Sequence, residues 1–321
     1  MKQKLTALLL AGALLFALSA CAGTAQPSSS QDDGVLTIAA TTYPVYELVR
    51  TLTDGMDGVE VRLVISQQVS CLHDYTLTVN NMRTLEEADV IVINGAGLEE
   101  FMDSALDAAD VPVIDASEGI SLLPASGEDA HDHAHESGDA HEEEYDPHIW
   151  LDPWRYQQMM DHIARGLSEL GYGDYEKDYL SVLHAADEQA ETAASAWKER
   201  FSMLPQEKRL LITFHDGFSY FADAYGLTIL RAIEEEAGSE ASAKDIREIV
   251  DLVREYDIPI IFVEENGSDA TAKAIQRETG VEIGTLSMLM SDNGEAYSDR
   301  VEKNLETVYN GLSGEKVTEN A

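Results

Sequence analysis

The chain has 321 residues, and its 60 acidic residues outnumber the 21 Lys and Arg, which gives a formal net charge of −39 at pH 7. Unassisted binding to nucleic acid requires clustered cationic side chains, so this composition argues against that function. A hydrophobic content of 44% supplies enough apolar side chains for sizeable cores. At roughly 100–200 residues per domain, the length indicates two domains.

The N-terminus has the organisation of an export signal. Lys2 and Lys4 precede an apolar run, 5–18, which is shorter than the roughly 18–20 residues that span a membrane. The run ends in Leu18-Ser19-Ala20-Cys21, which resembles the bacterial lipobox. We therefore expect residues 1–20 to be a lipoprotein signal peptide, Cys21 to be lipidated, and residues 21–34 to form a flexible tether. An ordinary cleaved signal or an uncleaved anchor is the alternative.

The first half after the tether alternates short apolar runs with amphipathic stretches. This alternation is typical of helices that cover a mostly parallel sheet. The predicted strands are 35–40, 59–65, 88–93 and 111–114, and the predicted helices are 43–52, 80–87 and 98–108.

Two helices are predicted in the middle of the chain, at 153–170 and 175–203. The second carries apolar residues on one side at spacings of three and four. At about 1.5 Å per residue it would extend roughly 43 Å, which is long enough to run along two lobes. The alternative is a pair of shorter core helices within one lobe.

The second half repeats the alternation of the first. Its predicted strands are 209–213, 227–230, 259–263 and 282–286, and its predicted helices are 217–225, 242–256, 270–278 and 297–312. We therefore predict an α/β fold of two similar lobes, joined by a long rigid helix. The expected limits are 35–152 for the N-terminal lobe, 153–203 for the connecting helices and 204–321 for the C-terminal lobe.

Three histidines follow predicted strands or precede a predicted helix. They are His73 in Ser-Cys-Leu-His-Asp-Tyr, His148 in Asp-Pro-His-Ile-Trp-Leu-Asp-Pro, and His215 in Thr-Phe-His-Asp-Gly-Phe. Loops at the carboxyl ends of parallel strands line the crevice of an open sheet. A single histidine in such a loop is more often an ordinary hydrogen-bonded residue. Three histidines from separate loops are able to converge on one metal ion.

These segments resemble the metal-specific solute-binding proteins of bacterial ABC importers, particularly the zinc group. Further matches are the lipobox, the segment 86–99 that ends in Asn-Gly-Ala-Gly-Leu-Glu, and Phe218-Ser-Tyr-Phe after His215. The matches run in family order from about residue 35 to 312. The resemblance implies two α/β lobes joined by a long helix, a metal held between them, and His73, His148 and His215 as its nitrogen ligands.

The chain departs from the family before its first histidine, where Cys71-Leu72 replaces the usual acidic residue and proline. Cys71 is either a thiolate ligand or a small buried thiol. The family's fourth ligand, when it is a carboxylate, comes from the second lobe, where the local match is poor. Glu264 and Asp292 are the candidates, and water is the remaining alternative.

Residues 128–146 form an acidic, histidine-rich insertion with His131, His133, His135 and His141. Such a segment lacks the apolar residues for a core, and its imidazoles and carboxylates are able to collect divalent cations weakly. We predict auxiliary metal capture, against the alternative of a solvated insertion without effect on uptake. The resemblance favours Zn²⁺, because insertions of this kind are typical of zinc members.

The predicted function is therefore extracytoplasmic capture of Zn²⁺ and its delivery to an ABC permease, with Mn²⁺ as the alternative ion. The chain would be a monomer, anchored to the cell membrane through Cys21. A zinc-dependent hydrolase is the competing class, because three histidines with an open fourth position also describe catalytic zinc. Against it, the sequence lacks a His-Glu-x-x-His motif. Cell adhesion fits a surface anchor, but no residue pattern is specific for it.

Overall fold

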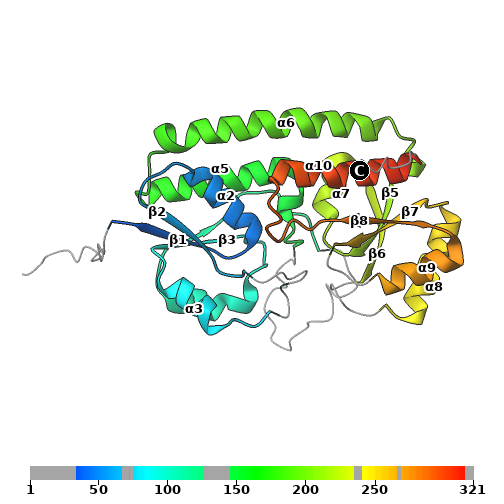
Figure 1. Ribbon diagram of the computed structural model, residues 1–321, viewed down its shortest axis with the longest axis horizontal. Coiled ribbons are helices and arrows are strands. Elements are labelled where there is room, and N and C mark those ends of the chain that lie inside the picture. The colour runs from blue at the N-terminus through cyan, green and yellow to red at the C-terminus, as the bar shows by residue number, and fades with distance from the viewer. Residues whose placement is uncertain are drawn as a thin grey trace, which may run out of the picture. The chain divides into compact units, whose positions relative to one another are not determined.

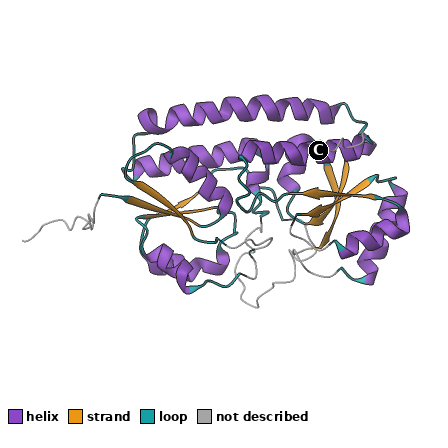
Figure 2. Cartoon of the chain, viewed as in Figure 1, coloured by secondary structure: helices purple, strands orange, loops and turns teal. Residues whose placement is uncertain are grey.

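The computed structural model describes residues 34–66, 72, 75–125, 145–234, 241–265 and 269–314 (Figure 1). From Leu36 onward these residues belong to one compact unit. They contain two four-stranded sheets, and Figure 2 shows helices beside the strands of each.

The first sheet is wholly parallel, with the strand order β2-β1-β3-β4. Its central strand β3 reads Val-Ile-Val-Ile, and three of these four residues are buried. Such a run of β-branched residues suits a strand covered on both faces. The strands are β1 (Leu36–Ala40), β2 (Val59–Leu63), β3 (Val90–Ile93) and β4 (Val113–Asp115), and the helices between them are α2 (Tyr43–Thr53), α3 (Val79–Glu86) and α4 (Asp103–Ala109).

The second sheet is also parallel and repeats the same connectivity in the order β6-β5-β7-β8. In strand β7, Ile260 and Phe262 pack into the main core cluster, whereas Ile261 and Val263 pack into a second cluster on the opposite face. This alternation follows from the period of two in a strand. The strands are β5 (Leu210–His215), β6 (Thr228–Glu234), β7 (Ile260–Glu264) and β8 (Glu282–Leu286), and the helices are α7 (Ser219–Tyr225), α8 (Ala243–Glu255), α9 (Ala270–Thr279) and α10 (Tyr297–Ser313).

Two helices connect the sheets in sequence, α5 (Pro153–Glu169) and α6 (Leu180–Ser202). The helix α6 packs on α5 and α10 and also contacts α2 and α7, so it reaches helices that follow strands of both sheets (Figure 1). Its buried side chains include Leu183, Trp197 and Phe201. The predicted α/β fold of two similar lobes with a long connecting helix is therefore confirmed, while the exact domain limits stay predictions.

Several element boundaries differ from the sequence predictions, most clearly those of three elements. The predicted helix 98–108 begins instead as a 3₁₀ turn, Glu100–Met102, because Met102 has a φ of −119° and interrupts the helix before α4. The predicted helix 175–203 opens with a π-helical turn, Tyr175–Tyr179, and becomes α-helical at Leu180. Strand β6 continues four residues beyond its predicted end at 230.

None of the helices in the described ranges is both apolar and long enough to cross a bilayer.

Each sheet has a central pair of strands that are neighbours in space but not in sequence. The strand order makes β1 and β3 neighbours in one sheet and β5 and β7 neighbours in the other, although each pair is separated in sequence. In open parallel sheets, the crevice beyond the carboxyl ends of such strands is the usual binding position. His215 and Glu264 are the last residues of β5 and β7, so the second sheet brings both to this position.

Candidate metal centre

His148 lies in a short rigid segment between the two sheets in sequence. It follows Pro147 and precedes a 3₁₀ turn, Ile149–Leu151. Directly afterwards, the carboxylate of Asp152 accepts a hydrogen bond from the backbone N–H of Trp154 at 2.8 Å and caps helix α5. The His148 side chain is thereby held at a helix start, with 7% of the residue exposed.

Asp146 fixes the orientation of the His148 ring. One oxygen of its carboxylate, Oδ1, accepts the backbone N–H of His148 at 2.9 Å and lies 2.7 Å from Nδ1 of the ring. The Nδ1 proton is therefore directed at the carboxylate, and the lone pair of the neutral ring is on Nε2. Burial alone would raise the pKa of Asp146, but the charge of His148 and these hydrogen bonds outweigh it and lower the pKa.

His215 is placed by the second sheet rather than by a loop. It is the last residue of β5 and only 2% exposed. The backbone of Gly217 packs directly against its ring: a methyl group added at Gly217 would lie 2.6 Å from Cδ2 and 2.9 Å from Nε2 of His215. Because glycine has no side chain, the imidazole of His215 is able to occupy this space.

The two histidine rings meet through their Nε2 atoms. These atoms are 3.1 Å apart, and the rings are nearly perpendicular, with centroids 4.9 Å apart. Two nitrogens that bind one tetrahedral zinc ion at about 2.0–2.1 Å are themselves about 3.4 Å apart. The observed separation is close to that value, so the pair offers two nitrogen donors aimed at one point.

Glu264 lies beside His215 on the other side of the ring. Its Oε1 atom is 4.0 Å from Nδ1 of His215, and the residue is 6% exposed. The Nε2 atom that faces His148 is the opposite nitrogen of the same imidazole. At 4.0 Å the two atoms lie beyond hydrogen-bond distance, so Glu264 is an acidic neighbour of Nδ1 on the side away from His148.

The segment around His148 is tied to the first sheet through Asn94, which follows strand β3. The Asn94 side chain donates hydrogen bonds to the carbonyl of Pro147 and to that of Gly95, both at 3.0 Å. Glu99 in turn accepts the backbone N–H groups of Asn94 and Gly95 at 2.8 and 3.0 Å. Burial raises the pKa of Glu99 to about 7, although these bonds oppose the shift.

The position of Gly95 in this network leaves no space for a side chain. Its φ is +78°, and a methyl group there would lie 1.8 Å from Oδ1 of Asp115. The Asn-Gly-Ala-Gly-Leu-Glu segment therefore acts as a clamp that holds the loop containing His148 against the end of β3.

Several predicted site residues lie outside the described ranges. These are His73, Cys71, Cys21 and the insertion histidines His131, His133, His135 and His141. Asp292 is described and exposed. Across the residues with described positions, no group of three or more His, Cys, Asp or Glu side chains gathers closely enough to hold a metal. The described part of the centre is the His148 and His215 pair.

Two residues important for the geometry were not singled out from the sequence. Asp146 belongs to the same motif as His148 but was assigned no role, and Gly217 was only the expected start of a helix. The sequence clue to Asp146 is that it lies two residues before His148 with a proline between them, because this spacing allows its carboxylate to contact the imidazole. The role of Gly217 depends on the side-chain position of His215, which has no sequence signature.

Two parallel-sheet lobes, a long connecting helix and a pair of buried histidines at a strand end and a helix start together define a solute-binding protein of the metal-binding type. A family model matches residues 38–311, and its description is zinc-uptake complex component A, periplasmic. The chain belongs to this family, which confirms the resemblance inferred from the motifs. The description names an uptake component, as the prediction of a binding protein expects.

Curated relatives with zinc and manganese names match most of the chain. The zinc-binding lipoprotein AdcA of Streptococcus pneumoniae (strain ATCC BAA-255 / R6) is 30% identical over 315 residues, which cover 95% of this chain and 60% of AdcA. The chain thus spans about three fifths of the length of that relative. The manganese-binding lipoprotein MntA of Halalkalibacterium halodurans is 24% identical, with 94% of this chain and 96% of MntA covered.

Solved structures with the same fold include metal-bound and adhesive proteins. A zinc-bound mutant variant of AdcAII from Streptococcus pneumoniae has a TM-score of 0.73 at 28% identity, covering 88% of this chain and 100% of AdcAII. The laminin-binding protein Lmb of Streptococcus agalactiae, described as bifunctional with adhesin and metal transporting activity, has a TM-score of 0.72 at 26% identity and covers 86% and 99%.

Proposed function

We propose that this protein captures Zn²⁺ outside the cytoplasm and delivers it to an ABC permease. His148 and His215 supply two of the nitrogen ligands, and His73 supplies the third. The proposal rests above all on the two Nε2 atoms 3.1 Å apart, with the ring of His148 turned by Asp146 so that Nε2 carries its lone pair. Family membership and the zinc-binding name of AdcA support the same ion.

The donor set favours zinc over manganese. Imidazole nitrogen is a good ligand for Zn²⁺, whereas Mn²⁺ is better served by carboxylate and carbonyl oxygen. Manganese remains the alternative cargo because MntA, with a manganese-binding name, matches nearly the whole chain.

The fourth ligand is proposed to be Glu264, with Asp292, Cys71 and water as alternatives. Glu264 is buried beside His215, whereas Asp292 is exposed on the surface. If it does not bind the ion, the carboxylate would need to move about 1 Å closer to Nδ1 of His215, from 4.0 Å, to hold the ring tautomer by a hydrogen bond.

The route to the membrane is proposed from the N-terminal sequence. Cys21 would carry the lipid, residues 21–34 would be the tether, and the anchored monomer would present its cargo to the permease. The lipoprotein names of AdcA and MntA support this location.

The insertion 128–146 is proposed to collect zinc near the principal site. A segment so poor in apolar residues would have to be ordered around the ion, and because that ordering costs conformational entropy its donors would bind more weakly than a preorganised site. Deleting residues 131–144 should remove a weak phase from a calorimetric zinc titration and leave one tight event of unchanged affinity. Loss of the tight event would mean that the insertion supplies a primary ligand.

The direct test is a competition titration of the full chain, stripped of metal, with zinc and manganese. We expect zinc to bind more tightly, and His148→Ala and His215→Ala each to weaken it by about a hundredfold or more, since losing a ligand should exceed the 10–100-fold effect of its hydrogen-bond partner. His184→Ala, an exposed histidine on α6, is the matched control. Manganese retained as well as zinc, or unchanged affinity in either ligand variant, would contradict the assignment.

A further inference from the structure

The turn that follows strand β8 has an unusual backbone conformation. Its residue Leu289 has a φ of +61° and is only 1% exposed. A bulky residue rarely adopts this left-handed conformation, which persists only where the surrounding contacts hold it. Asn304 on α10 holds the turn from one side: its side chain accepts the backbone N–H of Ser287 at 2.9 Å and donates to the carbonyl of Ser287 at 2.8 Å.

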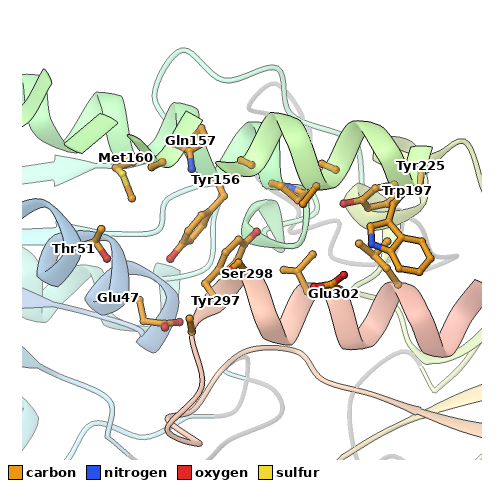
Figure 3. A pocket seen from close by; sticks show the side chains of 18 residues that line it. Glu47, Thr51, Tyr156, Gln157, Met160, Trp197, Tyr225, Tyr297, Ser298 and Glu302 are labelled. Atoms are coloured by element: carbon orange, nitrogen blue, oxygen red, sulfur yellow. The ribbon is translucent and has the colours of Figure 1, made fainter. Parts of the chain in front are cut away.

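Trp150 holds the same turn from the side of His148. Its indole N–H donates to the carbonyl of Met288 at 2.8 Å, and its ring centroid lies 5.2 Å from that of His148. Trp150 is supported in turn by the helices, because the hydroxyl of Tyr297 donates to its carbonyl at 2.7 Å. Figure 3 shows Tyr297 beside Tyr156 in the wall of a cavity between these helices, and the two rings are stacked with centroids 3.8 Å apart. The backbone of Met288 is therefore fixed relative to the segment that carries His148.

The side chain of Met288 lies beside the ring of His215. The residue is only 6% exposed. A methyl group added at Gly217 would lie 2.8 Å from Cε of Met288 and 2.9 Å from Nε2 of His215. The terminal methyl group of Met288 and Nε2 of His215 are thus separated by no more than the sum of these two distances. Nε2 is also the atom that faces His148, so this methyl group is a neighbour of the nitrogen that a metal ion would use.

A methyl group at this position affects an ion through the ligands that it excludes. Zn²⁺ is satisfied by four ligands in a tetrahedral arrangement. Mn²⁺ favours six oxygen ligands in an octahedral arrangement, and water supplies some of these oxygens in many sites. A methyl group neither donates nor accepts a hydrogen bond, so a metal-bound water next to it would lack a partner on that side. The side chain of Met288 therefore disfavours an ion that needs further waters.

We propose that Met288 sets the ion selectivity of the metal centre: the bulk of its side chain keeps further waters from the ion and so favours Zn²⁺ over Mn²⁺. Met288 acts as an apolar wall and not as a ligand, so its sulfur is not required. The fixed backbone of the turn supports this role, because a mobile side chain would yield to an additional water. The inference rests on the proposed function, since it takes His148 and His215 as metal ligands.

The test compares the zinc and manganese affinities of the full chain, stripped of metal, with those of Met288→Ala by competition titration. The ratio of zinc to manganese affinity should fall by about three- to tenfold, because the space that opens admits water and lets the manganese complex gain a hydrogen-bonded ligand. Met159→Ala, at a methionine of α5 that is 0% exposed, is the matched control. It should lower the melting temperature and leave the ratio unchanged. An unchanged ratio in a folded Met288→Ala chain would overturn the proposal.

Two variants of similar volume keep the test decisive if Met288→Ala does not fold. Met288→Leu keeps the apolar bulk without the sulfur, so it should keep the ratio of the parent chain. Met288→Gln places an amide, which hydrogen-bonds water, where the thioether lay, and should lower the ratio by about three- to tenfold. A tenfold or larger loss of zinc affinity in Met288→Leu would show that the sulfur is a ligand and would overturn the role as a wall.

The outcomes separate this inference from the proposed function. A parent chain that binds zinc more tightly than manganese, with the same ratio in Met288→Gln, would leave the proposed function intact and end the inference about Met288. A parent chain that binds neither ion would end both.

Discussion

The two histidines of the candidate metal centre are held in different ways. His215 ends a strand that pairs with β6 on one side and β7 on the other, so its backbone is fixed by the sheet. His148 belongs to no strand. Its backbone N–H donates to the carboxylate of Asp146, and the Asn94 side chain donates to the carbonyl of Pro147, so two side chains fix its segment.

This difference predicts different sensitivities. A paired strand is held by many backbone hydrogen bonds, and a single side-chain substitution nearby removes none of these. The loop around His148 depends on a few side-chain hydrogen bonds, each contributing about 0.5–1.5 kcal/mol. Single polar substitutions should therefore disturb His148, whereas His215 should respond to steric changes next to its ring.

The largest effect outside the ligands themselves is expected from Asp146→Asn. The amide keeps the size of the side chain but removes the negative charge that holds the Nδ1 proton of His148, so zinc affinity should fall by about 10–100-fold. Competition with a chromophoric chelator measures this directly. Asp161→Asn, which removes the ion pair with Arg165 on the surface of α5, is the control: it should leave zinc affinity unchanged. An unchanged affinity in Asp146→Asn would mean that His148 is oriented by its backbone alone.

Gly217→Ala should have the next largest effect, because the added methyl group would overlap the ring of the strand-held histidine. We expect zinc affinity to fall by about tenfold and stability by about 1–3 kcal/mol. Gly166→Ala is the matched control, since its methyl group would press on Ile114 at 3.0 Å, far along the chain from both histidines. Should both variants lose zinc affinity equally, general destabilisation and not the position of His215 would be the cause.

Asn94→Ala should affect the loop-held histidine more mildly. It removes one of the two hydrogen bonds that the carbonyl of Pro147 accepts and leaves the one from the backbone N–H of Ile149 at 2.9 Å, so the loss of stability should be about 0.5–1.5 kcal/mol. Zinc affinity should fall by about threefold, because Asp146 still orients the ring. Chemical denaturation and zinc competition on the same variant separate the two effects. A loss of affinity as large as that of Asp146→Asn would show that the clamp, and not the carboxylate, positions His148.

The smallest effect is expected from a residue that touches neither histidine. Burial raises the pKa of Glu47 to about 7, above its ordinary value of 4.5, and the residue lies 3.5 Å from Arg300 on α10. The folded state therefore holds this proton more tightly than the unfolded chain. The resulting stability is complete below pH 4.5 and declines as the pH rises to about 7.

Glu47→Gln should remove this decline, which we expect to amount to a melting-temperature change of about 2 °C after allowance for solvent screening. Below pH 4.5, where Glu47 is protonated, Glu47→Gln should melt close to the parent, because the amide resembles the neutral carboxyl group. Thermal melts between pH 4 and 8 measure both effects, with the exposed Glu306→Gln as the control. A slope that persists in Glu47→Gln would assign the pH dependence to another group.

The sequence predicted the strand-held half of the centre better than the loop-held half. The apolar run 209–213 places His215 directly after a predicted strand, and the observed strand β5 extends to His215 itself. The orientation of the His148 ring depends on its contact with Asp146, two residues earlier. The hydrogen bond from Asn94 to Pro147 joins residues that are 53 positions apart in the sequence. Such contacts arise from tertiary packing, which no local pattern encodes. Glu264 is a candidate because it directly follows the predicted strand 259–263. Which nitrogen of the His215 ring it faces depends on side-chain rotamers, and the sequence does not predict these.

Trp150 gives the metal centre an optical signal of its own. Its ring centroid lies 5.2 Å from that of His148, and its indole N–H donates to the carbonyl of Met288 at 2.8 Å. A protonated imidazole quenches the emission of a neighbouring indole, and a metal-bound imidazole carries no such proton. Trp154→Phe and Trp197→Phe would leave Trp150 as the only tryptophan of the chain. The fluorescence of that protein would report, without any label, when an ion arrives at His148 and how fast it leaves.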